Sequence, residues 1–401
     1  MSFSYSQKKI AILIFTLLII CFREVSLLIT PRFWAEEGTV YFLNAYSDGI
    51  MAIFYANQGY FSIIPNIATF FSTLVPLEYA PIPTLIISLL VILIPSILII
   101  SSDSEYLRPI WAKSFAIFII YFTTNTEEVW LNTITSQFWF LIIMFLILIE
   151  DKTSVTRNKT SLVLSLTFLS GLSGIPGNLI APFFLLRFFC KKQKLDLHIF
   201  STLLLTITIQ LIFISSTEHH SGRVFDMERL VPALISSITG VIQYPFIFKS
   251  IVGHKGALII MSIIISLIIN RNNYRDVLFL LSIPFFASTI MTFSSLNMNG
   301  GGRYFFSVSV IYILTIFYFL RSYKTSKTAK IIIYFYIITA LVVGIKKYNF
   351  KEGFTTHPNW KVWAEEVERY GTGKQNFISV YPQWDNAHWK IDMPDKEKAA
   401  Q

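Results

Sequence analysis

Long apolar runs recur along this chain, and they constrain its fold more than any other feature. A helix needs about 20 apolar residues to cross a bilayer. Only 14% of the residues are charged, whereas soluble domains carry roughly a quarter. We therefore predict an all-α polytopic membrane protein with about 10–11 transmembrane helices, from the runs 10–30, 81–101, 110–124, 131–149, 160–175, 178–190, 197–215, 256–270, 277–295, 304–320 and 330–346.

The basic residues predict how the chain is oriented. The net charge of +9 is concentrated in short loops between apolar runs, which is typical of loops on the cytoplasmic side. No basic helix with interleaved aromatic residues is present, so we expect no nucleic-acid partner. The first run follows Lys8 and Lys9 and has no small-residue cleavage site after it. We expect a retained first span, a cytoplasmic N-terminus and an outer C-terminus.

This orientation leaves two segments that do not fit as ordinary spans. Counting residues 58–76 as a span would place Glu127 on the inner side. The apolar spacing in residues 60–75 predicts an amphipathic helix on the outer surface, within an outer acidic loop at 31–78, and a span at 58–76 is the alternative. Residues 229–250 are apolar but contain two prolines and a glycine, which favours a re-entrant or surface-lying segment.

The composition changes near residue 347, and this change divides the chain. Residues 1–347 form the expected transmembrane bundle. Residues 348–401 are polar and aromatic, and we expect a small outer domain that begins with a helix at 358–370. About 50 residues bury little core by themselves, so this domain should pack on the outer loops. Glycines and prolines at 171–177 predict a break between the spans 160–175 and 178–190.

Two adjacent carboxylates, Glu36 and Glu37, follow the first apolar run. They lie in the stretch Pro31–Gly38, among aromatic residues of the kind found at the level of lipid headgroups. Crossing a bilayer does not require carboxylates here. We interpret them as catalytic or ligand-binding groups, and a solvated helix end is the alternative.

A second polar group of residues follows the third expected span. It includes Glu128, Asn132, Gln137 and Trp139. Asn132, Ser136 and Trp139 fall about one helical turn apart, which would place them on one face that points into the bundle. We expect Glu128, Asn132, Gln137 and Trp139 to bind substrate, and hydrogen bonding between membrane helices is the alternative.

A glycine run at 300–302 precedes Arg303 and Tyr304. An arginine stays charged and binds phosphate with two hydrogen bonds. We expect Arg303 and Tyr304 to bind a phosphate at the outer surface, and an arginine that reaches a lipid headgroup is the alternative. The pair His219 and His220 is a weak metal signal that we interpret as a solvated loop. No cofactor is expected, and a divalent cation is left open.

These groups fit the transfer of a sugar from a lipid phosphate to a hydroxyl. A carboxylate would accept the proton of the attacking hydroxyl. The phosphate leaving group is already a stable anion, so it needs a cation such as Arg303 and no strong acid. One base without a covalent nucleophile implies inversion at the sugar carbon.

The chain resembles the GT-C superfamily of polyprenyl-phosphate-sugar-dependent glycosyltransferases. The stretch Pro31–Gly38, the residues 128–139 and the sequence Gly302–Tyr304 carry the resemblance. The acidic loop, the size and the outer tail are also similar to phage-type glucosyltransferases that modify O-antigen and convert serotype. The resemblance implies a GT-C-like bundle in a bacterial inner membrane, a periplasmic tail, and Glu36 or Glu37 as the catalytic carboxylate. It also implies a polyprenyl-phosphate sugar donor, with glucose as the expected sugar, and a lipid-linked or polymeric glycan acceptor among membrane lipids.

The chain departs from the resemblance in one respect and leaves other functions open. Many relatives carry an aspartate where this chain has two glutamates, and no second metal ligand is evident. A transporter or flippase of a lipid-linked sugar is the main alternative, and it would use Arg23 and Glu24 for coupling. An O-antigen polymerase would require an outer loop richer in arginine, and a membrane O-acyltransferase would require a histidine within a span.

Overall fold

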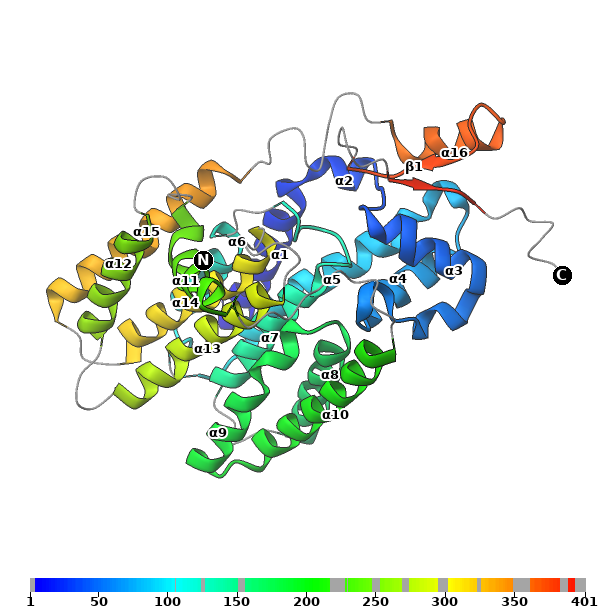
Figure 1. The fold of residues 1–401 in the computed structure, drawn as a ribbon. Helices are drawn as coiled ribbons and strands as arrows, with labels where there is room; N and C mark the ends of the chain where they lie inside the picture. Colours follow the sequence, from blue (N-terminus) through cyan, green and yellow to red (C-terminus); the bar gives the residue numbers. More distant parts are fainter. Residues whose placement is uncertain are drawn as a thin grey trace.

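The computed structural model describes residues 4–104, 106–123, 127–150, 156–216, 228, 230–246, 253–268, 274–294, 302–322, 326–348, 361–382 and 389–393. Helices dominate this part of the chain, and the strands β1 and β2 form one short pair near the C-terminus (Figure 1). The chain is therefore an all-helical polytopic membrane protein, apart from this strand pair.

Among the described residues, six helical segments are long and apolar enough to cross a membrane. Five are the helices α1 (Tyr5–Arg23), α10 (Lys194–Ser216), α13 (Tyr274–Phe293), α14 (Gly302–Ser322) and α15 (Lys327–Lys346), and the sixth joins the short turn η4 (Leu77–Tyr79) to α5 (Pro81–Ser101). Shorter helices occupy the other expected runs, and the total of 10–11 spans stays a prediction. They are α6 (Ile110–Phe122), α7 (Ser136–Ile149), α8 (Arg157–Leu172), α9 (Ala181–Lys191), α11 (Leu230–Gln243) and α12 (Gly253–Ile268).

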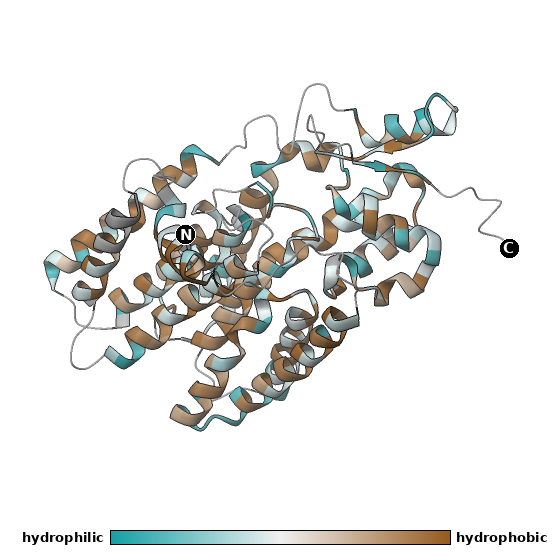
Figure 2. Cartoon of the chain, in the orientation of Figure 1, coloured by the Kyte–Doolittle hydropathy of each residue, from teal (hydrophilic) through white to brown (hydrophobic). Residues whose placement is uncertain are grey.

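The centre of the bundle is formed by α7 and α14. Every residue of α7 from Phe138 to Leu148 is buried, and 83% of the apolar window of α14 is buried, against 17% for α1 and 22% for α10. A helix that is apolar on all sides and fully enclosed belongs to the interior of a membrane bundle. The apolar faces of α1 and α10 are exposed in the chain alone, which fits contact with lipid. Figure 2 shows hydrophobic residues along the bundle helices and hydrophilic residues along α16.

Small residues allow close approach between helices that are distant in sequence. A Cβ atom on Gly344 of α15 would lie 1.2 Å from the backbone oxygen of Phe122 at the end of α6. Glycine is therefore required at this contact, as is common where membrane helices pack closely.

The two irregular regions that the sequence indicates are present as breaks in helices. The short helix η5 (Pro176–Ile180) separates α8 from α9, so the chain bends where glycine and proline cluster. In the second region, residues 229–250, the helix α11 ends near the middle of the neighbouring helices α14 and α15. The hydroxyl of Ser309 in α14 donates to the backbone oxygen of Val241 at 3.0 Å, and the hydroxyl of Tyr336 in α15 donates to Ile242 at 3.2 Å. A half-length helix of this kind is consistent with the expected re-entrant segment, whose membrane position stays a prediction.

The segment between α1 and α5 is built from short helices. They are α2 (Val25–Ile29), η1 (Glu37–Phe42), α3 (Leu43–Asp48), η2 (Gly49–Phe54), η3 (Asn57–Gly59) and α4 (Ile63–Ser72). The helix expected at 60–75 is α4, and its ten residues give a length of about 15 Å at 1.5 Å per residue. A bilayer core is about 30 Å thick, so α4 does not span one and the alternative of a span at 58–76 is disfavoured.

The C-terminal residues pack on this first loop (Figure 1). They form α16 (Trp363–Gly371), β1 (Ile378–Ser379) and β2 (Lys390–Ile391). The indole nitrogen of Trp363 donates to the backbone oxygen of Leu77 at 2.7 Å, and the amide of Ala35 donates to Tyr381 at 2.7 Å. A second hydrophobic cluster joins the two segments, with Phe33, Phe42, Ala80, Trp363, Val367, Ile378, Val380 and Ile391. The expected helix at 358–370 starts at Trp363 among the described residues.

Candidate functional site

Two loops that lie far apart in sequence meet at the buried carboxylate of Glu37. One carboxylate oxygen accepts the amide of Thr133 at 2.9 Å and also its hydroxyl, and the other oxygen accepts the amide of Trp34 at 3.2 Å. Glu37 as a whole is only 1% exposed. Burial raises the pKa of Glu37, and these hydrogen bonds oppose the increase. Glu37 therefore fixes the loop of residues 31–38 against the loop that precedes α7.

The backbone is strained on both sides of this contact. Ala35 has a φ of 43° and Leu131 has a φ of 51°, and non-glycine residues rarely adopt this left-handed region. In addition, η1 is a π-helix, a form that is rare and occurs frequently at functional sites. Such strain persists only where surrounding contacts determine it, and it is concentrated at active sites and ligand clamps.

Glu36, beside Glu37, is placed differently. Its residue is half-buried, and its side chain makes no hydrogen bond or ion pair with another described residue. Its charge acts on Glu128, which in turn pairs with Arg303 through Nε and Oε2 atoms 3.6 Å apart. Burial raises the pKa of Glu128, Arg303 lowers it, and Glu36 raises it further. The structure thus pairs a carboxylate and a guanidinium from two separate segments, and the charge of Glu36 on a third segment acts on both.

Arg303 and Tyr304 form the first turn of α14. The guanidinium of Arg303 lies 5.3 Å from the ring centre of Tyr304, and the ring of Tyr304 meets that of Phe138 in α7 at 5.7 Å. Both residues are half-buried. Because α14 is long enough to span a membrane, the guanidinium lies at the end of a candidate span, as expected for contact with a phosphate at the membrane surface.

The other residues expected to bind substrate have different roles. Asn132 precedes α7, which begins at Ser136, so the expected helix face with Asn132 is not formed. The side chain of Asn132 instead accepts the amide and hydroxyl of Thr135 and donates to the backbone of Glu128 at 2.6 Å. It therefore shapes the loop beside Glu128 and Thr133.

Trp139 and Gln137 lie within α7. The indole of Trp139 donates to the backbone oxygen of Val129 at 2.8 Å, and its residue is 1% exposed. Trp139 also packs against Phe306 with ring centres 4.8 Å apart, so it belongs to the core under the site. Gln137 is half-buried and donates to the hydroxyl of Tyr60 at 3.1 Å. It connects α7 to the first loop.

A second charged cluster, to which the sequence assigned no function, lies between the first loop and the loop before α7. A cavity of about 10 Å³, enough for about one water molecule, is lined in part by Arg32, Trp34, Glu127 and Trp130. Burial raises the pKa of Glu127 to about 7, and the neighbouring Glu24 adds to the increase. Burial lowers the pKa of Arg32 to about 10. The neighbouring positions of Glu127 and Glu128 in the sequence could have indicated this cluster. However, the sequence does not show that the two carboxylates lie in different environments.

Arg23 and Glu24, which the transporter alternative would use, are buried at the end of α1. The guanidinium of Arg23 donates to the backbone oxygen of Tyr121 at 2.5 Å and lies 4.4 Å from the ring centre of Trp130. These contacts join α1 to α6 and to the loop before α7.

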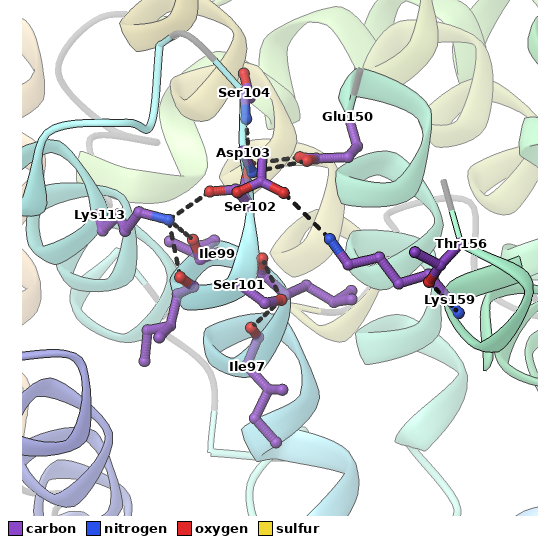
Figure 3. Close-up of polar contacts among 12 residues, drawn as sticks. Ile97, Ile99, Ser101, Ser102, Asp103, Ser104, Lys113, Glu150, Thr156 and Lys159 are labelled. Atoms are coloured by element: carbon purple, nitrogen blue, oxygen red, sulfur yellow. Dashed lines mark hydrogen bonds and ion pairs between the residues drawn. The ribbon is translucent and has the colours of Figure 1, made fainter. Parts of the chain in front are cut away.

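Another polar cluster lies at the C-terminal end of α5, at the opposite end of that helix from the first loop (Figure 3). The ammonium of Lys113 donates to the backbone oxygens of Ile99, Ile100 and Ser102 at 3.0, 2.8 and 2.5 Å. Glu150 accepts from the hydroxyl of Ser102 at 2.5 Å. The exposed ion pair between Asp103 and Lys159 has a distance of 3.1 Å. Lys113 thus supplies a charged donor to the carbonyls at the C-terminal end of α5.

Among the described residues, no group of three or more histidine, cysteine, aspartate or glutamate side chains could hold a metal ion. His219 and His220 lie outside the described residues. The divalent cation therefore stays open.

No family model, curated protein or solved structure matched this chain. The function must therefore be argued from the site itself.

Proposed function

We propose that this protein is an inverting glycosyltransferase that moves a sugar, with glucose as the first candidate, from a polyprenyl-phosphate donor to a glycan acceptor such as O-antigen. The observation that carries the proposal is the ion pair of Glu128 with Arg303 at the end of α14, on which the charge of Glu36 acts. The site combines a carboxylate that has no described partner with a cation where lipid phosphates would lie. We place it on the periplasmic face of a bacterial inner membrane, with the N-terminus in the cytoplasm.

Glu36 is the proposed general base. Its carboxylate would accept the proton of an acceptor hydroxyl while the hydroxyl oxygen bonds to the anomeric carbon of the sugar. The bond between that carbon and the phosphate oxygen breaks on the opposite face, and the electron pair leaves with the polyprenyl phosphate. Arg303 would stabilise the phosphate, with Tyr304 beside it. Glu37 is assigned a positioning role, because its oxygens are occupied by Thr133 and Trp34.

The test is a measurement of the glycan. The full chain is expressed in a bacterium with a defined O-antigen, together with a polyprenyl-phosphate glucose synthase and flippase, and the repeat unit is weighed by mass spectrometry. We expect a gain of one hexose per repeat. Glu36→Gln should abolish the gain, whereas the matched control Glu365→Gln, at an exposed position in α16, should retain it. Full activity in Glu36→Gln would contradict the proposed base.

Arg303 provides a separate test of donor binding. We expect Arg303→Ala to raise the KM for the lipid-linked donor at least tenfold, and to change the KM for the acceptor much less. Arg303→Lys should recover part of the loss, because it keeps the charge but lacks the planar fork. Equal effects on both KM values would indicate a structural role.

A transporter of the lipid-linked sugar is the second candidate, and Arg23 and Glu24, both buried at the end of α1, would be its coupling residues. If the glycan gains no hexose, transport of the lipid-linked sugar into vesicles that contain the purified chain is the test of the alternative.

A further inference from the structure

A groove of about 950 Å³ lies between the first loop and α16. One wall comes from α3 and the residues after α4, and the other comes from α16. The residues that give it chemical character are Tyr46, Thr73, Glu78, Glu368, Tyr370 and Thr372. The volume is within the range of about 300–1,000 Å³ that is usual for ligand sites.

We propose that this groove binds the saccharide chain of the acceptor. Tyr46 and Tyr370 are half-buried, one on each wall. The negative face of an aromatic ring attracts the slightly positive C–H groups on the face of a pyranose. The carboxylates of Glu78 and Glu368 accept hydrogen bonds from sugar hydroxyls, and threonine hydroxyls both donate and accept them.

The charges of the groove disfavour anionic ligands. Of the described residues, the charged ones that line it are Glu78 and Glu368, and both are acidic and exposed. An anionic lipid headgroup or a phosphorylated ligand would be repelled by two carboxylates. An uncharged polyhydroxyl chain has no such cost. The groove therefore suits the acceptor glycan and not the donor phosphate, which Arg303 would bind elsewhere.

The helix η1 connects the groove to the proposed active site. Phe42, which lines the groove, is the last residue of η1, and Glu36 immediately precedes the first residue of that helix. Six residues of helix extend on the order of 10 Å at an α-helical rise. The opposite wall is held in place by the hydrogen bond from Trp363 to Leu77. A saccharide in the groove could thus extend along η1 and present a hydroxyl to Glu36.

This inference rests on the proposed function for the identity of the ligand, but binding can be measured without transfer. The full chain is purified in lipid nanodiscs and tested by surface plasmon resonance on an immobilised panel of oligosaccharides released from bacterial O-antigens. No donor is present. We expect the wild type and the control Tyr79→Ala to bind the same panel member. Tyr79 is exposed beside the groove and does not line it.

Two groove variants should weaken binding at least tenfold. The first replaces Tyr46 and Tyr370 with alanine, and the second is Thr372→Trp, which fills the groove from an exposed position and removes no packed side chain. The proposal is overturned if no oligosaccharide of the panel binds, or if both variants bind as the wild type does. If cells gain a hexose and the groove variants gain it equally, the proposed acceptor groove is wrong but the proposed transfer is not. If oligosaccharides bind and the groove variants weaken the binding, but cells gain no hexose, the result counts against the proposed transfer.

Discussion

The contacts of Glu37 lead to a prediction that distinguishes its positioning role from the role of Glu36 as the base. In Glu37→Gln, one amide oxygen can still accept the two donors of Thr133. The amide nitrogen then faces the amide of Trp34, so that a donor meets a donor. One hydrogen bond to a charged acceptor is lost, which costs about 1.5–3 kcal/mol, and removal of the buried charge offsets part of this. We expect a net loss of about 2 kcal/mol in the local stability of the two loops.

Hydrogen exchange followed by mass spectrometry measures this loss directly. A change of 2 kcal/mol corresponds to a roughly 25-fold faster exchange, because about 1.4 kcal/mol is tenfold. The increase should be confined to peptides that cover residues 31–38 and 129–136. Glu36→Gln is the matched control, and we expect less than a twofold change because its side chain has no hydrogen bond to a described residue. Equal exchange in Glu37→Gln and the wild type, or an equal increase in both variants, would refute the assignment.

Three further predictions concern groups outside this contact. Lys113→Met should lower stability by about 2–3 kcal/mol, because the carbonyls of Ile100 and Ser102 lose this charged donor and that of Ile99 keeps only the amide of Ser102; thermal unfolding in detergent should show a lower midpoint. The pKa of Glu127 is raised to about 7. Its neutral form therefore stabilises the fold fully below the ordinary pKa of about 4.3, and this contribution is lost as the pH rises through 7. In Glu127→Gln, the melting temperature should change less than that of the wild type between pH 5 and 8. Asp196→Asn should cost about 3–5 kcal/mol, because Arg187 and Asp196 form a buried pair at 3.2 Å, and the double variant Arg187→Met with Asp196→Leu should recover most of the loss in melting temperature.

Helix positions were the part of the fold that the sequence could predict. The run 81–101 coincides with α5, and the run 110–124 nearly coincides with α6, because apolar length and prolines at helix starts are local properties. The break at 171–177 was also predictable, since glycine and proline weaken helices wherever they cluster. Each of these signals depends on residues that are close in sequence.

The arrangement of the site depended on contacts that carry no local signal. Thr133 lies 96 positions from Glu37, and neither residue type indicates the pairing. Asn132 was expected on a helix face, but a side-chain turn with Thr135 formed instead and α7 began later. Short polar side chains compete for backbone donors in this way before a helix starts. The two glutamates stand out in the sequence, yet only the tertiary contacts distinguish their environments.

The packing of the C-terminal residues on the first loop has a consequence for synthesis. A ribosome makes the loop of residues 31–80 long before it makes α16, so Phe33, Phe42 and Ala80 have no Trp363 or Val367 to pack against during that interval. Every intervening helix must be inserted before the tail can reach the loop. The loop that carries Glu36 is thus completed last although it is translated first, and a nascent chain that stalls within the bundle would leave it unfinished.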